Sequence, residues 1–110
     1  MQSNFEPSRS LMDFHIAGFA HHDGLSVIEE LKLGTKVDLR FEPDNPHDTH
    51  AVAIYYEDVK IGYIPTVKNA LFFTMLYYGH EIFEARISMV NTEVHPERQF
   101  RVSVKILDGR

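Results

Sequence analysis

The stretch FEPDNPHDTHAVAIYYEDVKIGYIP, residues 41–65, decides the fold of this chain. Its first half is rich in turn-forming and acidic residues, while residues 51–57 and 60–64 carry the apolar, β-branched and aromatic side chains of strands. The segment TKVDLRF (35–41), which leads into it, alternates apolar and polar residues and predicts a half-buried strand. The sequence therefore predicts a polar loop held between two strands.

The sequence on either side of this stretch adds more elements. Further strands are predicted at residues 12–20, 81–90 and 100–107. A short helix is predicted at 25–32, and a longer one at 66–78 would begin after Pro65 and end at Gly79. Because the longer helix is apolar almost all round, we expect it to be well buried at one end of a barrel.

Several short strands with one or two helices in 110 residues predict a mainly β protein, a small and partly closed OB-like or SH3-like barrel. A two-sheet α+β sandwich is the alternative. We expect residues 1–11 to form a flexible leader, 12–107 to form one domain and 108–110 to form a tail. The residues expected in the core include Phe41, Val52, Ile54, Ile61, Ile64 and Leu71.

Composition narrows the classes of function. The chain has no cysteine, which excludes disulfides and thiolate metal sites. It has no run of about 20 apolar residues and no apolar signal core, so a cytoplasmic protein without a membrane partner is expected. Eleven Lys and Arg against 16 Asp and Glu give a net charge of −5, which argues against binding along extended duplex DNA. Capture of a strand end or of a protein remains open.

The loop EPDNPHD (42–48) has two interpretations. Asp44, Asn45 and Asp48 can accept hydrogen bonds from nearby backbone N–H groups, so the loop can simply turn the chain. Alternatively, a proline-stiffened loop presents His47 and Asp48 to a ligand. The histidines near residues 21 and 47 lack the spacing of a metal site, and no nucleophile or phosphate-binding motif is present. We therefore expect neither a catalytic site nor a metal or cofactor.

One family shares this pattern of motifs. A Gly precedes a strand, an EP-x-NP-x-D loop leads to a strand that begins with Ala, and IGYIP is followed by a helix. The pieces here are Gly34, Glu42-Pro43, Asn45-Pro46-His47-Asp48, Ala51-Val52, Ile61-Gly62-Tyr63-Ile64-Pro65 and Ala70-Leu71. In order and spacing they resemble a HIRAN domain, and FHIAGF (14–19) is similar to the first strand of that family. The resemblance covers about residues 12–107.

The resemblance implies an OB-like barrel that captures the 3′ end of single-stranded DNA. The Asp that accepts a hydrogen bond from the terminal 3′-hydroxyl corresponds to Asp48, in the same loop as Asn45. The aromatic positions that stack on the end bases correspond to His15, with Phe14 beside it, and to His47. Groups that would hold a phosphate around the GYIP element and the following helix start are Tyr63, Thr66 and Lys68.

The implied role is a non-catalytic module in DNA repair or processing. Because the chain has no helicase motif, a separate helicase or nuclease would be its protein partner. The loop position usually held by Tyr in the family is His47 here. A different class of function stays open, namely a protein-interaction adaptor that has the same fold and has lost DNA affinity.

Overall fold

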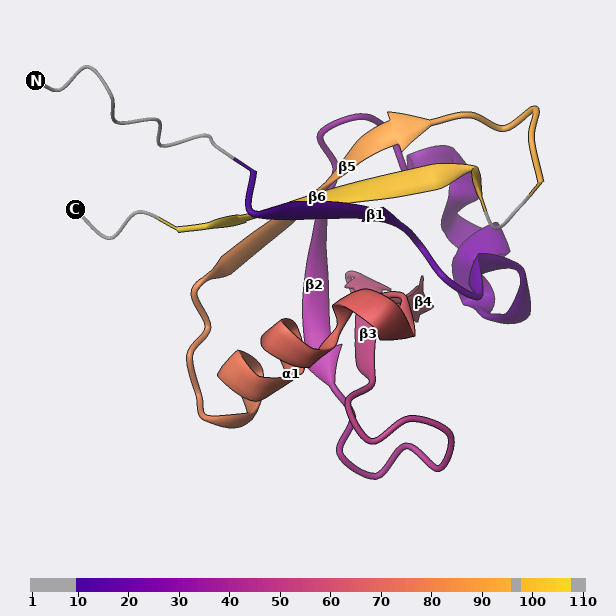
Figure 1. Cartoon of the computed structure of the whole chain (residues 1–110). Helices are drawn as coiled ribbons and strands as arrows, with labels where there is room; N and C mark the ends of the chain where they lie inside the picture. Colours follow the sequence, from indigo (N-terminus) through magenta and orange to yellow (C-terminus); the bar gives the residue numbers. More distant parts are fainter. Residues whose placement is uncertain (1–9, 96–97, 108–110) are drawn as a thin grey trace, which may run out of the picture.

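The computed structural model describes residues 10–95 and 98–107. Six strands form one antiparallel sheet in the order β1-β6-β5-β2-β3-β4 (Figure 1). Their bounds are Met12–His15 for β1, Lys36–Phe41 for β2, Val52–Tyr56 for β3, Val59–Tyr63 for β4, Phe83–Val90 for β5 and Phe100–Ile106 for β6. The predicted strands are therefore present, although the predicted strand 12–20 stops at His15 because Gly18 adopts a positive φ of 71° and a turn of 3₁₀ helix follows.

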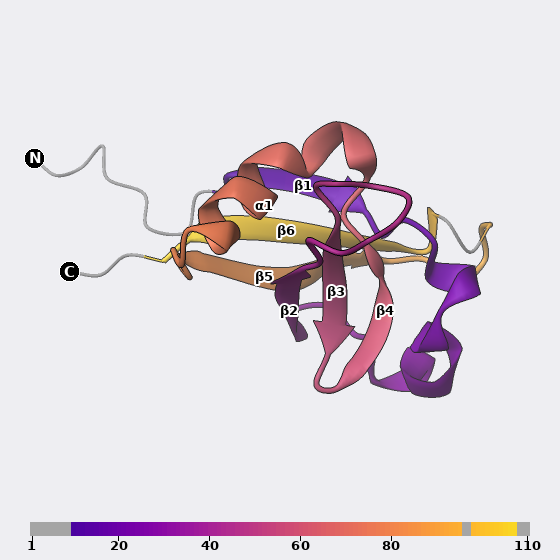
Figure 2. The ribbon, with the colours of Figure 1, turned by 90° about the horizontal axis from the view of Figure 1, so that it is seen from below.

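The sheet curls into a partly closed barrel. Strands β3 and β4 run across the direction of β5 and β6 (Figure 2), and β2 joins the two halves. The edge strand β4 meets the chain that follows β1, where Ala17 and Tyr63 exchange two backbone hydrogen bonds of 2.9 Å. This bridge closes the barrel on one side and confirms the mainly β, OB-like class.

Gly62 allows this closure. Its φ of 152° is a backbone conformation that residues other than glycine rarely adopt. A Cβ at this position would lie 2.6 Å from the carbonyl oxygen of Ala17. It would also overlap the side chain of Ile16. The glycine of the GYIP motif is therefore needed where β4 approaches the end of β1.

The helices differ from the prediction. Two 3₁₀ helices, Phe19–His21 and Asp23–Glu30, replace the single helix expected at 25–32. The predicted helix 66–78 is divided into a short 3₁₀ helix, η3 (Thr66–Lys68), and the α-helix α1 (Ala70–Tyr77). The prediction that this region is well buried was wrong, because Phe72 is the one residue of α1 that is buried.

The core combines side chains from every strand. Four phenylalanines are at most 1% exposed, and Phe72 of α1 contacts the rings of Phe14 and Phe83 edge-on. Val52, Ile54, Ile61 and Ile64 are buried as expected. Phe41 and Leu71 were also expected in the core but are 37% and 46% exposed. Phe41 is the last residue of β2, and Leu71 lies in the first turn of α1.

None of the helices that the described residues form has the length and hydropathy needed to cross a membrane. Most of the predicted leader and the whole predicted tail lie outside the residues that the structure describes. Leu11, which was assigned to the leader, donates its backbone N–H to Val104 of β6 at 2.7 Å and so belongs to the domain.

Candidate functional site

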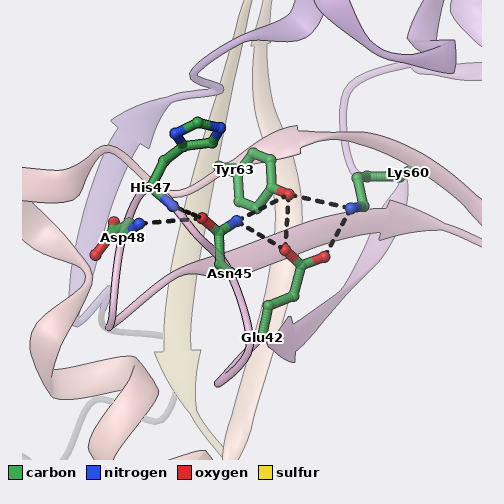
Figure 3. Close-up of polar contacts among 6 residues, drawn as sticks. All are labelled: Glu42, Asn45, His47, Asp48, Lys60 and Tyr63. Carbon is green, nitrogen blue, oxygen red and sulfur yellow. Dashed lines mark hydrogen bonds and ion pairs between the residues drawn. The ribbon is translucent and has the colours of Figure 1, made fainter.

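The loop between β2 and β3 is organised by the side chain of Asn45. Its Oδ1 accepts hydrogen bonds from the backbone N–H groups of His47 at 2.8 Å and of Asp48 at 3.0 Å (Figure 3). Its Nδ2 donates to Glu42 Oε1 at 3.1 Å on the other side. The oxygen and the nitrogen of the Asn45 side-chain amide therefore both hold the Asn-Pro turn in place. The bonds that the oxygen accepts from the following backbone N–H groups are typical of an Asx-turn.

The carboxylate of Asp48 is held between the loop and the helix start. Its Oδ1 accepts a hydrogen bond from the backbone N–H of His50 at 2.9 Å, and its Oδ2 accepts one from Asn69 Nδ2 at 2.7 Å. Asn69 is only 2% exposed, whereas Asp48 is half-buried. A carboxylate offers about four acceptor positions, so this one retains capacity for a further donor.

Asn69 makes this contact instead of capping its own helix. It is the N-cap residue of α1, a position where an asparagine side chain usually accepts a hydrogen bond from the first turn. No such side-chain bond is present at this helix start. The amide instead orients Asp48, 21 residues away in sequence.

A pocket of about 360 Å³ opens beside the loop. It is lined by Ala17, Gly18, His22, Asn45, His47, Asp48, Ala51, Tyr63, Ile64 and Thr66. The pocket thus brings together five of the residues expected to bind nucleic acid: Asn45, His47, Asp48, Tyr63 and Thr66. The ring of His47 points away from the polar contacts beneath the loop (Figure 3), and its side chain is exposed.

The other expected residues lie elsewhere. Phe14 is 1% exposed and packs in the core, so it was wrongly included as a stacking residue. Strand alternation places Phe14 inside and its neighbour His15 outside. Lys68, on η3, donates from Nζ to the backbone oxygen of Asp13 at 3.1 Å. His15 and Lys68 therefore lie outside the lining of the pocket, on the β1 side of the domain.

Three cations act electrostatically on His15. Partial burial lowers the pKa of His15 below its ordinary value, and the positive charges of Arg101, Arg98 and Lys68 lower it further. Asp13 opposes this effect and forms an ion pair of 2.5 Å with Arg101. His15 is thus favoured as a neutral ring, which suits it to stacking, while the nearby cations suit a phosphate.

Sequence reasoning missed three residues of this region. Asn69 lies at the start of α1, and His22 lies in a turn. Neither belongs to a sequence motif that would indicate contact with the loop between β2 and β3. The ring of His22 contacts Tyr63 edge-on with centroids 5.2 Å apart. Arg101 is found only through the register that pairs it with His15. Such contacts depend on tertiary structure, so spacing along the chain gives no signal for them.

The side chains of this region have the chemistry of a binding pocket. Within the part of the chain that the structure describes, no group of three or more His, Asp or Glu side chains could hold a metal ion. The residues that line the pocket carry amide, imidazole, phenol, hydroxyl and carboxylate groups, and Ala17, Ala51 and Ile64 are apolar. These groups are suited to a ligand that combines flat rings with hydroxyls.

Comparisons with known proteins agree with the geometry. The family model described as HIRAN domain matches residues 10–106. No curated protein matches the chain significantly. A crystal structure of a protein from Lactobacillus plantarum has a TM-score of 0.74 at 18% identity, over 86% of this chain and 90% of that one.

The crystal structure of the HIRAN domain of human HLTF is a second structural relative. It has a TM-score of 0.63 at 14% identity, over 84% of this chain and 69% of that one. At these identities the two structures establish a shared fold, and the family model supplies the assignment. The chain belongs to the HIRAN domain family, a family of nucleic-acid-binding modules.

Proposed function

We propose that this domain captures the 3′-hydroxyl end of single-stranded DNA, with Asp48 as the residue that recognises the hydroxyl. The observation that carries the proposal is the placement of the Asp48 carboxylate. Asp48 is among the residues that line an open pocket, and its carboxylate is fixed by the N–H of His50 and the amide of Asn69. A fixed carboxylate that only accepts hydrogen bonds favours a terminal hydroxyl and repels a terminal phosphate.

The other residues take roles that fit their surroundings. His47 is exposed at the mouth of the pocket and His15 is outward-facing on β1, so each can stack on an end base. Thr66 lines the pocket, and Lys68 and Arg101 lie on the β1 side where the preceding phosphates would pass. Because η3 is very short, its helix dipole adds little to phosphate binding.

The proposed activity is binding without catalysis. Remodelling or cleavage of the captured strand would be carried out by a separate helicase or nuclease in DNA repair or processing. The net charge of −5 fits an interaction limited to one strand end, because binding along a duplex needs an extended basic face.

A protein-interaction adaptor is the second candidate function. The observation in its favour is a group of exposed side chains on and beside α1, where Leu71 is 46%, Tyr77 55% and Tyr78 70% exposed. Such apolar groups are common at protein interfaces. An adaptor that has lost DNA affinity would bind no strand end, so one experiment separates the two candidates.

The test compares a linear single strand with a circular strand of the same sequence, measured by competition for the domain. Capture of an end requires the linear strand to compete far better, and Asp48→Ala is expected to remove that advantage. Equal competition by the two strands would reject end capture in favour of general strand binding. Failure of both strands to bind would favour the adaptor.

A further inference from the structure

A polar network lies beneath the loop that carries Asp48. Lys60 Nζ contacts Glu42 Oε2 at 2.7 Å and donates to Tyr63 Oη at 3.0 Å (Figure 3). Tyr63 Oη donates to Glu42 Oε1 at 2.7 Å. Asn45 Nδ2 donates to Glu42 Oε1 at 3.1 Å and lies 3.4 Å from Tyr63 Oη. The network therefore links the end of β2, strand β4 and the loop.

This network fixes the direction of the Asn45 amide. Glu42 is ionised and only accepts hydrogen bonds, so it attracts the amide nitrogen and repels the amide oxygen. The oxygen must then face the opposite way, toward the backbone N–H groups of His47 and Asp48. If the amide turned over, its nitrogen would face those two donors and the turn would lose both bonds.

The charge state of the network supports this arrangement. Partial burial alone would raise the pKa of Glu42, but hydrogen bonds from Lys60, Tyr63 and Asn45 outweigh it and lower the pKa below its ordinary value. The side chains of Lys60 and Glu42 are 27% and 24% exposed. A shielded ion pair of this kind is less screened by salt than one on the surface.

We propose that Glu42 and Lys60 are positioning residues, which act through Asn45 to hold the loop in the shape that presents Asp48. The inference rests on the proposed function for its DNA-binding consequence, whereas the effect on the loop is independent of DNA. The EP of the motif thus has a role separate from turning the chain, because its glutamate selects one orientation of the asparagine three residues later.

The test uses Glu42→Gln with Glu84→Gln as its matched control. Glu84 is also a shielded carboxylate with two cations, Arg86 at 3.4 Å and Lys105 at 3.3 Å. It lies on β5, which two strands separate from β4. Both variants remove one negative charge, and charge alone predicts equal or tighter binding of DNA in both. If DNA binding becomes weaker in Glu42→Gln and not in Glu84→Gln, the loss of a negative charge cannot be the cause.

Two measurements are made on each variant. Amide hydrogen exchange without DNA is expected to become faster at His47 and Asp48 in Glu42→Gln and to stay unchanged in Glu84→Gln. The affinity for an oligonucleotide with a 3′-hydroxyl is expected to fall about tenfold in Glu42→Gln, as expected for loss of hydrogen bonds to a charged group. Thermal denaturation of both variants establishes that each remains folded.

The outcomes separate this inference from the proposed function. Unchanged exchange at His47 and Asp48 in Glu42→Gln would overturn the inference, whatever the DNA affinity. Faster exchange together with no end binding by the unaltered protein would support the role of the network in shaping the loop and reject 3′-end capture. Faster exchange together with weaker end binding supports both.

Discussion

Both carboxylate oxygens of Asp48 accept a hydrogen bond from a neutral donor, the N–H of His50 or the amide of Asn69. No ion pair that the described residues form involves this carboxylate, so none of the described cations is paired with it. Its orientation is thus fixed while its negative charge is kept. That combination suits a residue which must attract a hydroxyl and repel a phosphate.

Replacement of Asn69 tests how far this orientation depends on one amide. We expect Asn69→Ala to lower the free energy of unfolding by about 1–3 kcal/mol, because a buried hydrogen bond to a charged group is lost. We also expect it to weaken binding of 3′-hydroxyl ends. Thr74→Ala, an exposed change on the same helix, is the control and should leave both unchanged or slightly raise stability. Chemical denaturation and an end-binding titration check this, and an Asn69→Ala variant that binds ends normally would contradict it.

At the residue scale the sequence predicted the loop better than its surroundings. The Asx-type bonding of Asn45 follows from local chemistry, and the structure confirms it. Phe14 was misplaced because a strand exposes alternate residues and the sequence alone did not establish which face of β1 is buried. The part played by Asn69 could not be predicted, since it depends on how η3 and α1 pack against the loop.

The helices show a different limit at the scale of elements. An apolar sequence from residue 66 to 78 predicted a buried helix, but Phe72 is the one buried residue of α1. Tyr77 and Tyr78 remain largely exposed. Phe41, which is 37% exposed, contacts the ring of Phe73 of α1 edge-on, with the ring centroids 5.7 Å apart.

The contact of β4 with the end of β1 gives a prediction at the same scale. Gly62→Ala should destabilise the domain by about 2–4 kcal/mol, because two costs are combined. The backbone conformation is strained for Ala, and the added Cβ would overlap Ile16 and Ala17. Gly79→Ala is the matched control, since Gly79 has a φ of +85° but nothing within 4 Å of an added Cβ. It should cost about 1 kcal/mol. Equal losses in the two variants, measured by thermal or chemical denaturation, would show that close approach at Gly62 is unimportant.

At the scale of the whole molecule, charge and shape act together. The domain is acidic overall, yet Arg101, Arg98 and Lys68 influence His15 on the side of β1. The partly closed barrel was predicted correctly from strand patterns and length. The strand order was not predicted, because it depends on long-range pairing such as that of Ala17 with Tyr63. For the same reason, the sequence alone did not reveal the group of cations.

This distribution of charge predicts two separable effects on DNA binding. Arg101→Ala should weaken the binding of hydroxyl-ended and of phosphate-ended strands by the same factor, because both strands offer the same internal phosphate to Arg101. The slope of log K against log salt should fall by about 0.7, the value for one contact with a single strand. Lys36→Ala, an exposed lysine on β2, should change neither quantity. A loss confined to the hydroxyl-ended strand would contradict this division of roles.

The most direct test of the account is the ratio of dissociation constants for one oligonucleotide prepared with a 3′-hydroxyl and with a 3′-phosphate. We expect the unaltered domain to bind the hydroxyl end at least about tenfold more tightly, since one charge-assisted hydrogen bond is gained and one repulsion is avoided. Asp48→Ala should bring the ratio close to one. Equal affinity of the unaltered domain for both ends, or a preference that persists in Asp48→Ala, would contradict recognition of the hydroxyl by Asp48.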